Sequence, residues 1–178
     1  MKLTGMDESE KMNDSLLKLI LLANVAATLY LVGLIWFVQL VHYPLFGHVG
    51  PNVFSAYETA HSIRTTIAVG PPMLIEALTT ALLLLYRPAN ISFISALIGA
   101  VLLAVIWFST WFLQVPQHTI LASGFDPEAH HFLVVSNWLR TFAWSGRGGF
   151  VLSILPVKPP NSFVGRSGPL RRSGKASA

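Results

Sequence analysis

The chain has 178 residues and a formal net charge of +4; 53% of its residues are hydrophobic, 11% are charged and none is cysteine. Several apolar runs approach the roughly 20 residues that cross a hydrocarbon core of about 30 Å. This composition excludes an ordinary soluble domain, disulfides and thiolate metal ligands. An integral membrane protein is expected.

Residues 1–15 are predicted to form a cytoplasmic N-terminal segment. It does not resemble a cleavable signal peptide, because its charges are mixed and the apolar run that follows is too long and lacks a small-residue cleavage site. Asp14 and Ser15 are suitable caps for a first helix.

Residues 16–155 are predicted to form an all-α bundle of four membrane-spanning helices, with connections too short for a second domain. Residues 88–90 are expected to end the second span and cap the third, and Asp126 to begin the fourth. Pro71 and Pro72 are expected to kink the second span. The predicted spans are 16–42, 63–86, 91–113 and 132–155.

Residues 156–178 are rich in Pro, Gly, Ser and Arg and are predicted to form a disordered basic tail. Lysine and arginine precede the first span, follow the second and follow the fourth, so the positive-inside rule places both termini in the cytoplasm of a multi-pass cell (inner) membrane protein. Contact with anionic lipid then accounts for the basic excess, and no nucleic-acid partner is expected. All six histidines fall on the outer side: His42, His48, His61, His118, His130 and His131.

Each predicted span carries polar residues at helical spacing. Charged groups avoid lipid, so these stripes are expected to face the bundle interior and to form a polar cavity that is widest toward the outside. The stripes consist of Gln39 and His42; Glu58, His61 and Glu76; Trp107, Thr110 or Trp111, Gln114 and His118; and Asn137, Arg140, Trp144 and Arg147.

Glu76 and Arg140 lie at similar depth from the outer ends of their predicted spans, so a buried ion pair between them is expected. Such a pair either marks a functional site or only holds the helices together. Arg147 lies deeper and is expected to reach the cytoplasmic headgroups.

Glu58 and His61 have the spacing that places a carboxylate and an imidazole on one helix face. With His42 or His118 they would form a mononuclear site suited to iron, zinc or copper. The alternative is that these residues only hydrogen-bond to loop backbone at the interface. Haem b is less favoured, because histidines at the ends of spans leave little depth for a macrocycle.

Three short motifs recur in one known family: "VHYPLF" (41–46), "QVPQHTIL" (114–121) and "NWLRTFAW" (137–144). In these the chain resembles the anthrone-oxygenase-like family of small four-span membrane proteins. The resemblance implies a four-helix membrane bundle, and some members oxidise electron-rich aromatic carbons with dioxygen. The positions that carry over are His118, Trp138, Arg140 and Thr141.

Three functions remain open. The first is an oxidoreductase acting on a lipophilic, weakly acidic substrate, with His118 or His61 as base and Arg140 with Asn137 stabilising the oxyanion. The second is a non-catalytic subunit that binds a quinone, lipid or pigment, or joins a homo-oligomer or larger membrane complex; Gly146, Gly148 and Gly149 would permit close helix approach. The third is a small transporter. The candidate catalytic set is His118, Arg140, Asn137 and Glu76, and the candidate substrate pocket is Trp107, Thr110, Gln114, Trp138, Thr141 and Trp144.

Overall fold

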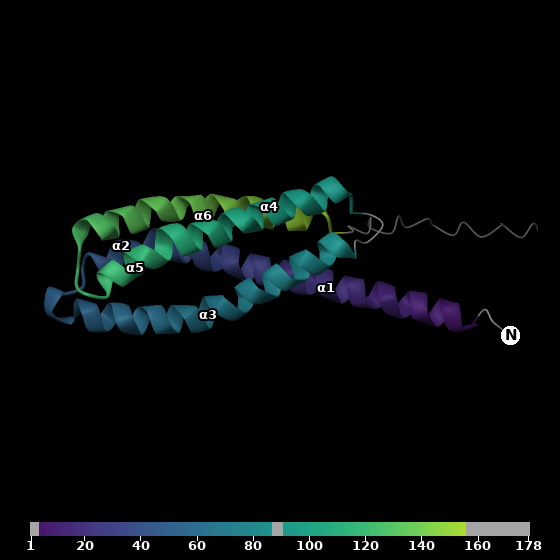
Figure 1. Ribbon diagram of the computed structural model, residues 1–178, viewed down its shortest axis with the longest axis horizontal. Helices are drawn as coiled ribbons and strands as arrows, with labels where there is room; N and C mark the ends of the chain where they lie inside the picture. The colour runs from purple at the N-terminus through teal and green to yellow at the C-terminus, as the bar shows by residue number, and fades with distance from the viewer. Residues whose placement is uncertain (1–3, 87–90, 156–178) are drawn as a thin grey trace, which may run out of the picture.

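The computed structural model describes residues 4–86 and 91–155, with side chains from residue 15 onward, and these parts of the chain are helical without any strand (Figure 1). The predicted all-α class is therefore confirmed. The elements are α1 (Thr4–Phe37), η1 (Val38–His42), α2 (Tyr43–Phe46), α3 (Pro51–Leu85), α4 (Phe93–Ser109), η2 (Thr110–Gln114), α5 (Val115–Leu121) and α6 (Pro127–Ser153), where η1 and η2 are π-helical turns.

Four long helical columns pack side by side, because η1 joins α1 to α2 and η2 joins α4 to α5 without a break (Figure 1). The first column packs against α3 and α6, and α4 packs against both of these as well. Three helices within the described residues are long and apolar enough to cross a membrane: Ser15–Phe46, Pro51–Leu85 and Phe93–Leu121. α6 is not among them, since it carries several polar and charged residues.

Several predicted helix boundaries need correction. α1 begins at Thr4, so Asp14 and Ser15 lie inside a helix and do not cap it. Ser92 caps α4 by accepting a hydrogen bond from the Ser95 amide at 3.0 Å, a role predicted for residues 88–90, of which the structure describes none. The predicted tail, 156–178, lies outside the described residues as well. Asp126 does cap α6, as predicted, by accepting a bond from the Ala129 amide at 2.8 Å.

The second column begins earlier than predicted. α3 runs from Pro51, so Glu58 and His61 lie within the helix, about two and three turns after its first residue. It continues through Pro71 and Pro72, and its ribbon bends in the middle part of its length (Figure 1). A bend at prolines is expected, because they remove backbone donors and crowd the preceding turn.

Both π-turns end immediately before an X–Pro pair. The amide of Tyr43 bonds to the Val38 carbonyl, and that of Val115 bonds to the Thr110 carbonyl, each five residues back. The next residue in both cases is a proline, which has no amide hydrogen to donate. A π-turn widens the helix locally and is often found at functional sites. Here the two turns contain or adjoin the polar residues of the first and third columns.

Gly148 of α6 packs closely against α1. A Cβ atom there would lie 3.0 Å from Val32 Cγ2, whereas at Gly149 it would meet no atom within 4 Å. We therefore expect Gly148→Leu to lower the free energy of unfolding by about 1–3 kcal/mol through overpacking. Thermal unfolding in mild detergent measures this, with Gly149→Leu as the matched control. Equal stability of the two variants would contradict the packing described here.

Candidate functional site

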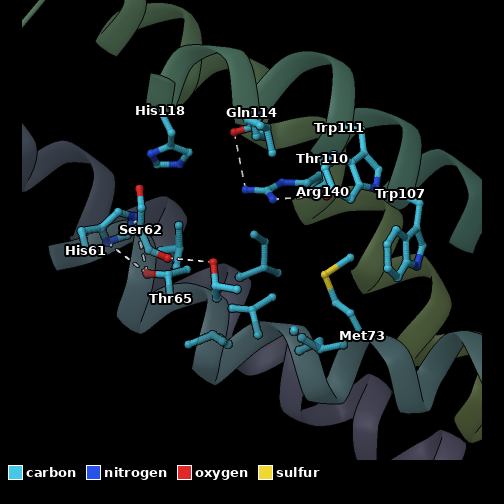
Figure 2. A pocket seen from close by; sticks show the side chains of 18 of the residues that line it. His61, Ser62, Thr65, Met73, Trp107, Thr110, Trp111, Gln114, His118 and Arg140 are labelled. Atoms are coloured by element: carbon cyan, nitrogen blue, oxygen red, sulfur yellow. Dashed lines mark hydrogen bonds between the residues drawn. The ribbon is translucent and has the colours of Figure 1, made fainter. Parts of the chain in front are cut away.

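A cavity of about 630 Å³ lies between the four columns. Figure 2 shows side chains of α3 on one side of this cavity and side chains of α4, η2 and α5 on the other, with Arg140 of α6 reaching into the space between them. Most of the wall is apolar, and only a few polar groups reach the cavity. A volume in this range suits a small organic molecule.

The cavity is open between α3 and the η2–α5 segment. Its lining includes residues of both elements that are themselves exposed on the outside of the bundle, among them Leu74 at 62% and Trp111 at 58%. Both belong to helices apolar enough to span a membrane. The opening therefore faces sideways, toward the surface that lipid would cover.

Among the described residues that line the cavity, Arg140 is the one lysine or arginine. It is only 7% exposed, and among the described residues it makes no ion pair. Its Nε donates to Asn137 Oδ1 at 2.9 Å, and its terminal nitrogens donate to neutral oxygens of Tyr43 at 3.3 Å and Gln114 at 3.5 Å. A buried guanidinium without a carboxylate partner is costly, and an anionic ligand would offset that cost.

Asn137 holds Arg140 in place. Its side-chain oxygen accepts from the guanidinium, while its Nδ2 donates to Gln39 Oε1 at 2.8 Å. Asn137 is fully buried and does not line the cavity. Its position therefore suits a residue that orients Arg140, and not one that touches a ligand directly.

Tyr43, His118 and Glu58 continue the polar end of the cavity. The Tyr43 hydroxyl contacts both Arg140 and His118 Nε2, the latter at 3.0 Å. His118 Nδ1 lies 2.6 Å from Glu58 Oε1. Glu58 is fully buried, and its other oxygen, Oε2, has no hydrogen-bond partner among the described residues. An imidazole between a carboxylate and a hydroxyl is an arrangement that can accept and pass on a proton.

His61 lies beside this group, as the sequence predicted. A carboxylate oxygen of Glu58 and one ring nitrogen each of His61 and His118 all lie within 4.8 Å of one another. His42 is outside that set, but its Nε2 is 2.8 Å from His61 Nδ1. The predicted metal-ligand residues therefore do gather in one place, at the end of the bundle where α2 and α5 lie.

The predicted ion pair between Glu76 and Arg140 is wrong. Glu76 Oε1 instead accepts from Arg147 Nε at 2.6 Å, and Arg147 is 1% exposed, so the prediction that it reaches the headgroups is wrong too. The depth estimate failed because α3 starts at Pro51, twelve residues before the predicted span. Glu76 therefore lies farther from the outer end of its helix than predicted, at the depth of Arg147.

The Glu76–Arg147 pair connects all four columns. Thr28 of α1 donates to Glu76 Oε1 at 2.6 Å and Trp144 donates to Oε2 at 3.2 Å. Arg147 also donates to the Gly99 carbonyl of α4 and to the Thr80 hydroxyl of α3. Neither charge faces the cavity. The arrangement favours the structural interpretation of this pair over a catalytic role for Glu76.

The structure brings four of the six residues predicted for a substrate pocket to the cavity wall. Trp107, Thr110, Gln114 and Trp144 line the cavity, but Trp138 and Thr141 do not. Trp138 packs edge-on against Trp36 at 5.8 Å, and Thr141 is fully buried with its hydroxyl bonded to Gln39 and to the Asn137 carbonyl.

Several polar residues that line the cavity were not predicted as site residues, namely Tyr43, Ser62, Thr65, Thr66 and Thr119. Tyr43 lies inside the quoted motif "VHYPLF", and the proline after it was the available signal. Trp107 was predicted for the substrate pocket and does line the cavity, but its indole N–H is buried without a partner among the described residues.

No family model, curated protein or solved structure matches this chain. The resemblance to the anthrone-oxygenase-like family therefore stays a prediction.

Proposed function

We propose that this protein is a multi-pass cell-membrane protein whose cavity binds a lipophilic small molecule with a weakly acidic head group. Its architecture would be a four-helix membrane bundle with both termini in the cytoplasm. Support comes from three apolar helices long enough to span, and from α6, whose charged residues Arg140 and Arg147 are turned into the bundle. A helix that buries its charges in this way can lie in lipid among three others.

The observation that carries the proposal is the Arg140 guanidinium, which forms no ion pair among the described residues and lies in the wall of a largely apolar cavity. Its charge would stabilise an anionic oxygen of the ligand. The apolar body of the ligand would occupy the remaining volume. Entry from the lipid phase agrees with the sideways opening between α3 and η2–α5.

The reaction we propose is oxidation of such a ligand by dioxygen. For a ring CH₂ group conjugated to a carbonyl, His118 would accept a proton from the carbon, and Arg140 would hold the resulting enolate oxygen. Addition of dioxygen and return of the proton give a hydroperoxide. Loss of water then leaves a second carbonyl, so R₂CH₂ and O₂ become R₂C=O and H₂O, with carbon oxidised and dioxygen reduced.

Filling the cavity tests the proposal. Gly70 lines it, and a Cβ there would meet no atom within 4 Å, so Gly70→Leu introduces a side chain whose first atom enters open space at the cavity wall. Anthrone is a suitable probe, because it is lipophilic and its enol tautomer is a weak acid. We expect Gly70→Leu to weaken anthrone binding at least tenfold, which corresponds to about 1.4 kcal/mol. Quenching of tryptophan fluorescence in detergent micelles measures the affinity.

Gly33→Leu is the matched control, since Gly33 is an exposed helical glycine outside the cavity with equally open space around it. Equal affinity in the two variants would contradict binding in this cavity. Oxygen uptake with anthrone then separates the functions: binding with uptake supports the oxidoreductase, and binding without it favours the ligand-holding subunit.

A further inference from the structure

The strongest feature beyond the ligand cavity is the group formed by Glu58, His61 and His118. Glu58 and His61 lie one helical turn apart on α3, and His118 comes from α5 on the opposite side. One candidate ligand atom from each lies within 4.8 Å of the other two. Small movements of side chains would bring such atoms to the spacing found around a single metal ion, whose bonds to nitrogen and oxygen are about 2.0–2.2 Å.

The charge at Glu58 is incompletely balanced. Its carboxyl group is fully buried; Oε1 lies 2.6 Å from His118 Nδ1 and accepts from the Ser62 hydroxyl at 3.1 Å, but Oε2 has no partner among the described residues. No lysine or arginine in the described parts of the chain forms an ion pair with it. A buried carboxylate with a free oxygen is the expected state of a cation site before the cation binds.

The two imidazoles are already oriented. His61 contacts His42 through Nδ1 at 2.8 Å, and His118 contacts the Tyr43 hydroxyl through Nε2 at 3.0 Å. Each ring therefore keeps one further nitrogen for coordination. Histidines bound to metal commonly have the second ring nitrogen held by a hydrogen-bond partner in this way, which fixes the ring and its tautomer.

We propose that Glu58, His61 and His118 bind one divalent transition-metal ion, with His42 and Tyr43 orienting the two histidines. Two imidazoles and one carboxylate suit zinc, iron or copper. The ion would take the place of the hydrogen bond between His118 Nδ1 and Glu58. Since His61 and His118 both line the cavity, the open coordination position would face the ligand space.

The role of this metal in turnover rests on the proposed function, but metal binding itself does not. With His118 occupied as a ligand, a metal-bound hydroxide would accept the proton of the cavity ligand. The proton converts that hydroxide to water, and the anion formed stays at Arg140. Binding of metal and binding of anthrone can be measured separately, so failure of one proposal does not resemble failure of the other.

The test uses the full chain purified in mild detergent, stripped with a chelator and then exposed to Co²⁺ or Zn²⁺. We expect one metal ion per chain by elemental analysis, and visible absorption bands from Co²⁺ in a low-coordinate nitrogen and oxygen site. His61→Ala and Glu58→Gln should each lose nearly all of the bound metal. His131→Ala is the matched control and should keep it, since His131 is an exposed histidine of α6 outside the group.

Circular dichroism and thermal unfolding show whether each variant is folded. Wild-type protein that retains no Co²⁺ or Zn²⁺ would overturn the proposal, and so would metal binding that survives both His61→Ala and Glu58→Gln. If chelated, metal-free protein still binds anthrone, the cavity proposal stands without the metal. If metal binds and anthrone does not, the cavity proposal fails alone.

Discussion

Replacement of Arg147 by methionine is expected to lower the free energy of unfolding by about 3–5 kcal/mol. The change removes the cation that lies 2.6 Å from Glu76 Oε1 and leaves a carboxylate that is fully buried. It also leaves the Gly99 carbonyl and the Thr80 hydroxyl without this donor. An uncompensated charge in the interior costs more than the lost contact, because the carboxylate cannot regain its hydration.

Thermal or denaturant unfolding in detergent measures this effect, and the double variant identifies its cause. With Glu76→Gln added to Arg147→Met, neither charge of this pair remains, so we expect most of the stability to return. Arg64→Met is the control, since Arg64 is an exposed arginine of α3. A double variant as unstable as Arg147→Met alone would show that altered side-chain packing, and not the uncompensated charge, causes the loss of stability.

The fold could be predicted largely from patterns of hydrophobicity. Apolar runs of membrane length gave the helical class, and the helical spacing of polar residues correctly indicated which faces turn inward. Helix ends were less predictable. α1 continues back to Thr4 through a polar sequence, and α3 begins at Pro51, because ordinary helix-forming residues can extend a helix beyond its apolar part.

In the candidate site, residue pairs within one helix could be predicted, but pairs between helices could not. Spacing within one helix placed Glu58 beside His61, since that relation depends only on helical geometry. Contacts between helices depend on the relative depth of the residues. Because the start of α3 was predicted wrongly, Arg140 was predicted as the partner of Glu76, whereas the structure pairs Glu76 with Arg147. The π-turns before Pro44 and Pro116 rotate the helix face on which the following residues lie. The position of Tyr43 in the cavity wall could therefore not be derived from regular α-helical periodicity.

Arg140 and Arg147 lie two turns apart on α6, yet very different effects on stability are expected from the same substitution. Arg140→Met removes a buried cation that has no ion-pair partner among the described residues, and only neutral oxygens lose a donor. The relief of charge burial and the lost hydrogen bonds oppose each other, so we expect the free energy of unfolding to change by about 1 kcal/mol or less. The principal effect should fall on ligand binding.

For the ionised form of the anthrone probe, Arg140→Met is expected to weaken binding by about 100-fold, or roughly 3 kcal/mol, the upper end of the range for a hydrogen bond to a charged group. Wild-type affinity should rise with pH as more of the probe ionises, whereas the affinity of Arg140→Met should not. Arg140→Lys keeps the charge but not the planar donor geometry, so its affinity for the probe should lie between that of the wild type and that of Arg140→Met. Fluorescence titrations across pH measure all three, with Arg64→Met as control. A variant that keeps the wild-type rise with pH would mean that Arg140 does not bind the anion, since the rise depends on a cation within the cavity.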